Sequence, residues 1–245
     1  MARKKRPELT FQQHVADYLV REHKYGVLEQ SDITDTAHYI AEDQLWAFLK
    51  ATQSDTLQKL EDDYGTDARE EVFKALRKEL EHTPLWMLFR RGLQVRGLEF
   101  RLFYSKPRSA ASAAAEKYAQ NRITFRPHFY FGDTNQEIDS VFFLNGLPIV
   151  ALELKHEANQ NVHDAVAQFI HRDHAKKIFQ RPILYLAADT CDVMAATDAL
   201  VERGVASGRA EAIGLGETKP IADQATKAGS QRNRRVEVYL IEGGQ

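Results

Sequence analysis

The chain has 245 residues, of which 43% are hydrophobic and 28% are charged, and its formal net charge is −2. This length and composition suffice for one sizeable hydrophobic core and a small second unit. The near-neutral charge gives no global signature of a nucleic-acid-binding protein, so any such contact would depend on local patches. The single cysteine, Cys191, excludes an intrachain disulfide framework and suits a reducing compartment.

The start of the chain is basic, with the run Arg3-Lys4-Lys5-Arg6, and no hydrophobic signal region follows it. No stretch reaches the apolar length of a membrane span. The sequence therefore predicts a cytoplasmic protein without a membrane partner. A solvated tail explains the basic run better than a DNA-binding arm does.

The first hundred residues are predicted to be mainly helical. Residues 8–23 carry apolar side chains at helical spacing, including Phe11, Val15 and Leu19. Further amphipathic helices are expected near residues 41–51, 66–80 and 84–91.

The hydrophobic period then changes to that of strands. Residues 98–104 and 122–126 have strand character, and the small-residue connector 107–116 is predicted to be a loop or a short helix. Beyond them we expect an acidic hairpin over residues 137–155, a helix over 162–176 and a strand over 183–187. The pattern predicts an α/β (α+β) fold.

The acidic hairpin carries the residues with the most chemical information. Glu153 and Lys155 are two positions apart on a strand and therefore emerge on one face, and Asp139 lies on the strand before them. Because unpaired buried charge is costly, a divalent metal between the two carboxylates would explain this pattern. Mg²⁺ prefers oxygen ligands and commonly takes one or two carboxylates. The alternative is a surface strand in which Glu153 and Lys155 merely solvate an edge.

The run Leu144 to Lys155 resembles the nuclease domain of the restriction (R) subunit of type I restriction-modification enzymes. The matching positions are Asp139, the turn Asn145-Gly146-Leu147-Pro148, and Glu153 with Lys155. Gln168 matches the glutamine of a Gln-x-x-x-Tyr motif on the following helix. Arg172 stands where the family has tyrosine.

This resemblance covers about residues 1–198 and implies a restriction-endonuclease-like PD-(D/E)xK core, a central mixed sheet flanked by helices. It implies a magnesium-dependent endonuclease with Asp139 and Glu153 as metal ligands. Lys155 would assist the attacking water, and Gln168 would complete the catalytic set. The implied partners are double-stranded DNA and the methyltransferase and specificity subunits of a restriction complex. ATP would be used only by longer relatives with a translocase, since no GxxxxGK[ST] loop occurs in the chain, which we interpret as a truncated form.

DNA contacts are assigned to basic residues near the acidic hairpin. Arg122 and Arg126 lie on the preceding strand, and Lys155 and Arg172 lie beside the carboxylates in sequence or by motif. These four residues are the candidate DNA-binding positions.

The register of the hairpin tests the metal hypothesis. A strict two-residue Asn145-Gly146 turn would pair Asp139 with Leu152 and would place Asp139 and Glu153 on opposite faces. A shared metal site requires one residue of offset. We therefore predict a three-residue loop, Asn145 to Leu147, or a bulge near Asp139, favoured by Pro148.

Residues 199–245 resemble the C-terminal portion of OmpA-like peptidoglycan-binding domains. The matching runs are Gly214-Leu215-Gly216-Glu217 and Asn233-Arg234-Arg235-Val236-Glu237. The ligand-gripping loop and helix of that family are missing from the chain. We therefore expect a short, incomplete α/β fragment that does not bind peptidoglycan.

Three functional hypotheses result. The preferred one is a magnesium-dependent endonuclease domain of a type I restriction subunit. The second is a non-catalytic relic or an assembly or DNA-binding piece of the restriction complex, which the altered position Arg172 favours. The third, a peptidoglycan-binding module, is disfavoured by the missing ligand loop.

Overall fold

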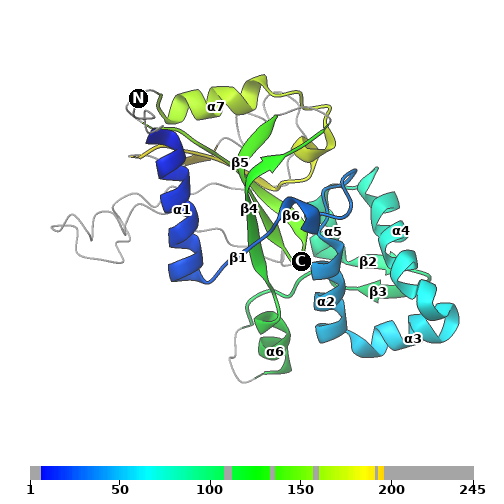
Figure 1. Cartoon of the computed structure of the whole chain (residues 1–245). Coiled ribbons are helices and arrows are strands. Elements are labelled where there is room, and N and C mark those ends of the chain that lie inside the picture. Colours follow the sequence, from blue (N-terminus) through cyan, green and yellow to red (C-terminus); the bar gives the residue numbers. More distant parts are fainter. Residues whose placement is uncertain (1–6, 108–111, 133–135, 157–159, 191–192, 196–245) are drawn as a thin grey trace.

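The computed structural model describes residues 7–107, 112–132, 136–156, 160–190 and 193–195. A six-stranded mixed sheet forms its centre, in the order β1-β4-β5-β6-β7-β8 (Figure 1). Strand β5 pairs antiparallel with β4 on one side and with β6 on the other. The pairs β1-β4 and β6-β7 are parallel. The strands are β1 (Gly26–Val27), β4 (Ile123–Tyr130), β5 (Glu137–Leu144), β6 (Leu147–Leu154), β7 (Leu184–Ala188) and β8 (Val193–Ala195).

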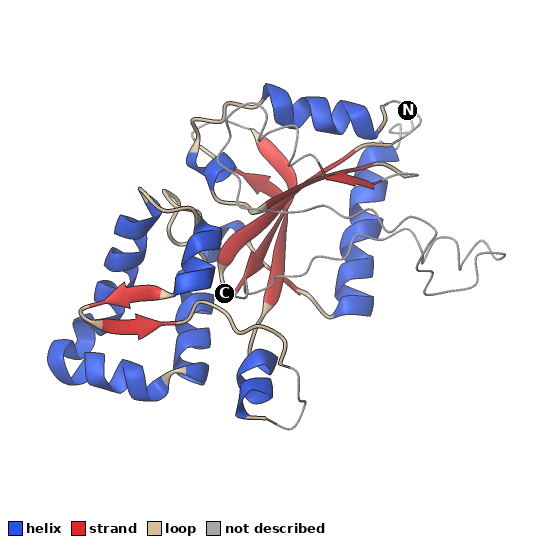
Figure 2. Cartoon of the chain, turned by 180° about the vertical axis from the view of Figure 1, so that it is seen from behind, coloured by secondary structure: helices blue, strands red, loops and turns tan. Residues whose placement is uncertain are grey.

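Helices flank this sheet, and a small two-stranded sheet lies among the helices of the first half of the chain (Figure 2). The α/β fold predicted from the sequence is therefore confirmed. The α-helices are α1 (Pro7–His23), α2 (Glu42–Thr52), α3 (Ser54–Tyr64), α4 (Ala68–Leu80), α5 (Leu85–Arg91), α6 (Ala113–Ala119) and α7 (Val162–His171). The short hairpin is β2 (Leu93–Val95) with β3 (Leu98–Phe100), and single 3₁₀ turns are η1 (Gln30–Asp32), η2 (Gly65–Asp67) and η3 (Lys177–Gln180).

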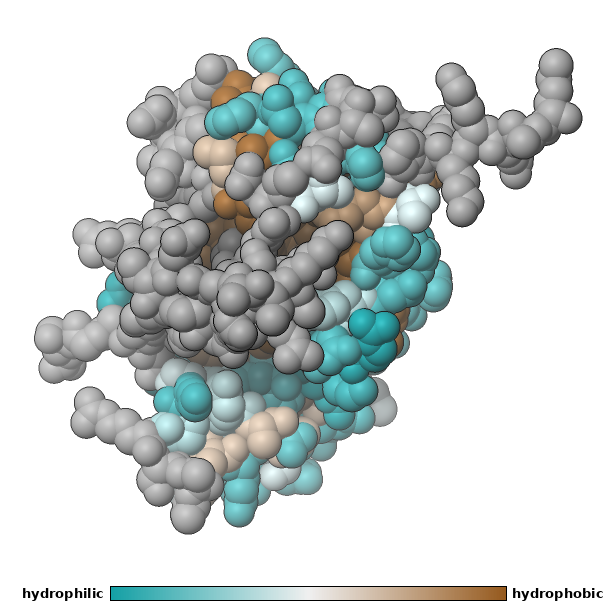
Figure 3. All heavy atoms as spheres, turned by 90° about the vertical axis from the view of Figure 1, so that its left-hand side faces the viewer, coloured by the Kyte–Doolittle hydropathy of each residue, from teal (hydrophilic) through white to brown (hydrophobic). Residues whose placement is uncertain are grey.

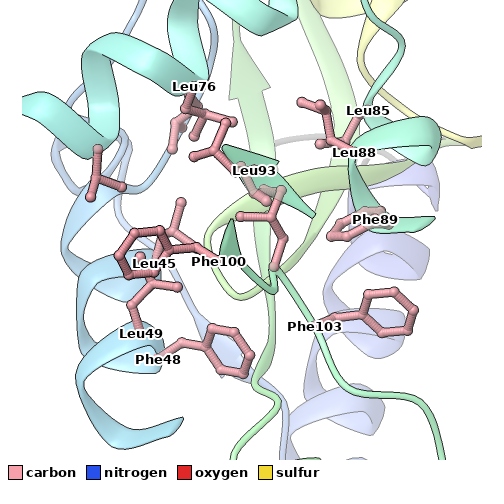
Figure 4. Packing of buried hydrophobic residues seen from close by; sticks show 14 of the residues in the cluster. Leu45, Phe48, Leu49, Leu76, Leu85, Leu88, Phe89, Leu93, Phe100 and Phe103 are labelled. Carbon is pink, nitrogen blue, oxygen red and sulfur yellow. The ribbon is translucent and has the colours of Figure 1, made fainter. Parts of the chain in front are cut away.

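The largest hydrophobic core joins helices α2 to α5 and the β2-β3 hairpin to one end of the central sheet. Its helical side includes Phe48, Leu76 and Phe89, and the hairpin contributes Leu93 and Phe100 (Figure 4). Leu147 and other residues of the central sheet belong to the same core. Helices α2 to α5 and the β2-β3 hairpin, together called the helical lobe, are therefore packed against the turn between β5 and β6.

The two faces of the central sheet are covered by different helices. On one face, Phe11 and Val15 of α1 pack against Leu152 and Leu154 of β6. On the other, Phe169 of α7 shares a core with the alternate β6 residue Ala151. Because alternate side chains of a strand point to opposite faces, α1 and α7 lie on opposite sides of β6.

Figure 3 views the molecule from the α1 side, where hydrophobic and hydrophilic residues are interspersed on the visible described surface. Of the helices in the described ranges, none has both the length and the apolar character needed to cross a membrane.

Several predicted boundaries differ from the structure for local reasons. The strand predicted over residues 98–104 ends at Phe100, since the backbone N–H of Arg101 donates to Gln53 instead of to a strand partner (2.7 Å). The helix predicted to residue 176 ends at His171, and the side chain of Asp173 then accepts a hydrogen bond from the N–H of Ala175 (3.1 Å), a local bond that competes with helix. Helix α3 and strands β1, β2 and β8 are not among the elements that the sequence predicts.

The turn between β5 and β6 is a strict two-residue turn. Asn145 and Gly146 have φ values of 52° and 81°, and Leu144 pairs with Leu147. Positive φ at both central positions is the preference of Asn-Gly in tight hairpins. The predicted three-residue loop is therefore wrong.

The predicted one-residue offset is nevertheless present, and it arises from a bulge. Phe143 pairs with Pro148 but Phe142 pairs with Val150, so Ile149 is the extra residue. The register continues with Ser140 opposite Leu152, which places Asp139 opposite Glu153. The bulge lies beside Pro148, which favours such an irregularity because proline has no backbone N–H to donate. It is several residues away from Asp139.

Asn145 fixes the turn to the surrounding loops. Its side chain is fully buried and donates to the carbonyl of Leu102 (2.9 Å) and the side chain of Asn121 (3.1 Å). Its Oδ1 accepts from the backbone N–H of Arg122 (2.8 Å). The adjacent Gly146 packs so closely on α2 that a Cβ there would lie 2.3 Å from the carbonyl oxygen of Ala41.

Gly146→Ala is therefore predicted to destabilise the fold by about 3 kcal/mol or more, since it combines a backbone clash with a strained positive φ. Urea unfolding followed by circular dichroism measures the change. Gly97→Ala is the matched control, since Gly97 also has a positive φ but no atom within 4 Å of the added Cβ. Equal losses in the two variants would contradict the role of the Ala41 contact.

Candidate active site

Two carboxylates from adjacent strands meet near the end of β6. Asp139 of β5 is 7% exposed, and Glu153 of β6 is fully buried. The Oδ2 atom of Asp139 accepts a hydrogen bond from the backbone N–H of Leu154 (2.6 Å), which fixes its carboxylate beside Glu153. The sequence-predicted pair is thus brought together on one side of the β5-β6 ladder.

Both oxygens of Glu153 receive hydrogen bonds from the C-terminal end of α7 and the residue that follows it. Gln168 donates its Nε2 to Oε2 (2.8 Å), and Arg172 donates Nη2 to Oε1 (2.7 Å). Gln168 lies in the last turn of α7, and Arg172 is the residue directly after the helix. The structure therefore brings the predicted residue Gln168 to the carboxylate pair, and Arg172 with it.

Burial disfavours the charged form of both carboxylates. It raises the pKa of Asp139, against the hydrogen bond from Leu154. Burial and then the negative charge of Asp139 raise the pKa of Glu153 to about 8, although Arg172 acts in the opposite direction. The protein thus holds two acidic groups with less positive charge around them than two ionised carboxylates require.

Lys155 follows directly after β6 and extends its amine to α1. Its backbone N–H donates to the carbonyl of Ala188 (2.8 Å), and its Nζ lies 3.3 Å from Oε1 of Glu8. The lysine charge lowers the pKa of both Asp139 and Glu153. Sequence reasoning missed Glu8, because a contact that spans 147 positions leaves no local pattern.

The other two predicted DNA-binding arginines make different contacts. Nη1 of Arg126 lies 3.3 Å from the carbonyl of Leu28 and 3.3 Å from Oε2 of Glu29. Arg122 uses its backbone N–H to bind Asn145, at the turn end of β4. Arg122 and Arg126 therefore contact residues of loops and turns, whereas Lys155 and Arg172 contact acidic side chains at the site.

The donor set suits a hard divalent cation. Asp139 and Glu153 offer carboxylate oxygens on neighbouring strands, and Mg²⁺ commonly takes one or two protein carboxylates while keeping water molecules. No group of three or more His, Cys, Asp or Glu side chains with the arrangement of a metal site occurs in the described part of the chain. The site therefore fits a magnesium-type centre of two carboxylates better than a closed cage of protein ligands.

A mixed sheet with carboxylates on two adjacent strands, a lysine directly after the second strand and helices on both faces is the arrangement of the PD-(D/E)xK nuclease fold. Residues 5–185 match the family described as "Type I restriction enzyme R protein N terminus". The chain belongs to this family. The resemblance inferred from the hairpin motif is confirmed.

Two short matches concern proteins of another class. The chain is 58% identical over 41 residues to outer membrane porin F of Pseudomonas fluorescens, and 54% identical over 47 residues to outer membrane porin F of Pseudomonas aeruginosa. These matches cover 17% and 19% of this chain, and 13% of each porin. They confirm the resemblance to an OmpA-like C-terminal region. Residues 199–245 and the predicted boundary at residue 198 lie outside the described residues.

The raised pKa of Glu153 predicts that the metal-free protein loses stability as the pH rises. Between the pKa of the unfolded chain, near 4.5, and about 8, the folded state keeps a proton that the unfolded state releases. Stability therefore falls across this window. Glu153→Gln removes the titrating group, so its melting temperature should exceed that of the wild type by about 2–6 °C at pH 8.5 and by much less at pH 5.

Thermal melts in EDTA at the two pH values measure this difference. Glu116→Gln, at an exposed position of α6, is the matched control. Its melting temperature should differ from that of the wild type by the same amount at both pH values. The prediction would be contradicted if the melting-temperature gain of Glu153→Gln were equal at the two pH values or larger at pH 5.

Proposed function

We propose that this chain is a magnesium-dependent endonuclease domain of a type I restriction subunit, acting on double-stranded DNA. The observation that supports this best is the convergence of the buried Asp139 and Glu153 carboxylates, with Lys155 adjoining them. Membership of the restriction-subunit family favours the same chemistry.

In this proposal Asp139 and Glu153 hold the metal. When bound, Mg²⁺ lowers the pKa of a coordinated water and neutralises charge on the phosphate. Lys155 orients the attacking water and stabilises the negative charge that develops on the phosphate. Gln168 keeps one oxygen of Glu153 in a fixed direction, through its 2.8 Å hydrogen bond.

Glu8 holds the amine of Lys155 at the N-terminal end of α1. The apolar contacts of Phe11 and Val15 with Leu152 and Leu154 anchor this helix to β6. Lys155 is thus positioned by a helix from one face of the sheet, and Glu153 by a helix from the other.

The proposal extends to partners and to the division of the chain. Residues 1–198 form the nuclease domain, and residues 199–245 form a separate OmpA-like fragment. Arg122, Arg126 and Lys155 are the proposed contacts to DNA phosphates. The methyltransferase and specificity subunits of a restriction complex are the proposed protein partners.

A non-catalytic role in the same complex is the second candidate. The ion pair between Arg172 and Glu153 favours it, because an arginine charge already compensates a proposed metal ligand. Such a domain would bind DNA or the other subunits without cleaving.

Nicking of supercoiled plasmid in Mg²⁺ distinguishes the two candidates. We expect the wild-type chain to nick the plasmid, and Glu153→Ala and Asp139→Asn each to lose about 10²- to 10³-fold in rate, since both remove charge that holds the metal against the phosphate. EDTA should abolish the reaction.

Glu116→Ala serves as the control for substitution of a distant glutamate, and circular dichroism establishes that each variant is folded. Folded wild-type protein that fails to nick at any Mg²⁺ concentration would contradict the endonuclease proposal and support the non-catalytic one. Nicking that persists in Glu153→Ala would contradict the assigned site.

A further inference from the structure

We propose that Arg172 is a positioning residue that acts as the resident counter-cation of Glu153 and thereby restrains the affinity of the Asp139–Glu153 pair for a divalent metal. This inference rests on the proposed nuclease function and deepens it. It assigns to Arg172 a regulatory effect on metal loading in place of a contact with DNA.

The guanidinium of Arg172 is anchored from three directions. Nη2 lies 2.7 Å from Oε1 of Glu153 and 2.6 Å from the carbonyl oxygen of Glu137, at the start of β5. The guanidinium carbon lies 5.6 Å from the ring centre of Phe131, within the range of a cation–π contact. The side chain is only 14% exposed. Arg172 is thus built into the site and directed at the carboxylate, with little of its surface open to a DNA backbone.

The local charges show what this position does to a metal ion. Asp139 and Glu153 carry two negative charges when ionised, and Arg172 and Lys155 carry two positive charges beside them. A divalent ion entering this site meets a carboxylate pair that Arg172 and Lys155 already compensate in part, and the arginine repels the ion at short range. Because only 14% of the arginine side chain is exposed, solvent screens this repulsion weakly.

The hydrogen bonds of Glu153 impose a second constraint. Gln168 occupies Oε2 and Arg172 occupies Oε1, so each oxygen already has a donor. The bond to Gln168 is neutral, whereas the bond to Arg172 is charge-assisted and roughly twice as strong. Arg172 is therefore the stronger competitor with a metal ion for Glu153.

Isothermal titration calorimetry with Mn²⁺ tests the proposal in the full chain without DNA and without any measurement of cleavage. Arg172→Gln keeps a hydrogen-bond donor but removes the charge, and we expect it to bind Mn²⁺ about tenfold tighter or more than the wild type. Arg172→Lys keeps the charge although it loses the stacked, planar guanidinium, and it should bind Mn²⁺ less tightly than Arg172→Gln does. Asp139→Asn identifies the heat that belongs to this site.

A merely structural role of Arg172 predicts the opposite sign, because a disordered Glu153 would bind the metal less tightly. Equal or weaker binding by folded Arg172→Gln would therefore overturn the proposal and leave the metal site intact. Absence of Mn²⁺ binding by the wild type and by Arg172→Gln would overturn the proposed metal site together with this inference.

A measurement on the wild type covers the case in which Arg172→Gln does not fold. The side-chain ¹⁵N resonance of Arg172, identified by its loss in Arg172→Lys, should shift as Mg²⁺ binds, since the metal displaces the guanidinium from Oε1. A resonance that is unchanged while Mg²⁺ occupies the site would overturn the proposal.

Discussion

The extra residue in β6 determines the geometry of the candidate site. Without Ile149 as a bulge, the Asn145-Gly146 turn would pair Asp139 with Leu152 and direct the two carboxylates to opposite faces of the sheet. The bulge shifts the ladder by one position, and Asp139 then lies opposite Glu153. The tight turn below it is itself held in place by the buried side chain of Asn145 and by the contact of Gly146 with Ala41. The helical lobe thus contributes to the site indirectly, by fixing the hairpin that carries it.

Desolvation is the second constraint, and it follows from the first. Two carboxylates placed together in a β-sheet lose water, which raises the pKa of both, and the negative charge of Asp139 raises the pKa of Glu153 further. The protein compensates this cost in part, with Arg172 and Gln168 on Glu153 and with the charge of Lys155 nearby. A buried acidic pair with incomplete compensation has residual affinity for cations. In this chain that affinity depends on how much positive charge the helices supply.

Those compensating groups come from both faces of the sheet. Helix α7 packs through Phe169 on the face of Ala151 and directs two side chains at Glu153. Helix α1 packs on the opposite face and holds Lys155 through Glu8. The site therefore depends on the docking of a helix from the start of the chain, where Glu8 lies 147 positions before its partner Lys155. A change in either helix interface would alter the balance of charge around the carboxylates.

The sequence by itself determined the family, the α/β class, most of the helices and the identity of Asp139, Glu153, Lys155 and Gln168 as the candidate residues. These features depend on local periodicity and on a short motif, and both can be recognised from residues that are close together in the sequence. Only the tertiary structure decided the position of the bulge, the pairing of Glu8 with Lys155 and the contact of Arg172 with Glu153. A bulge at Ile149 and a loop at Asn145 give the same offset, so the pattern of side chains could not distinguish them. Contacts between residues far apart in the chain arise from the packing of α1 and α7 on opposite faces of β6, and no local interaction of the chain encodes that packing.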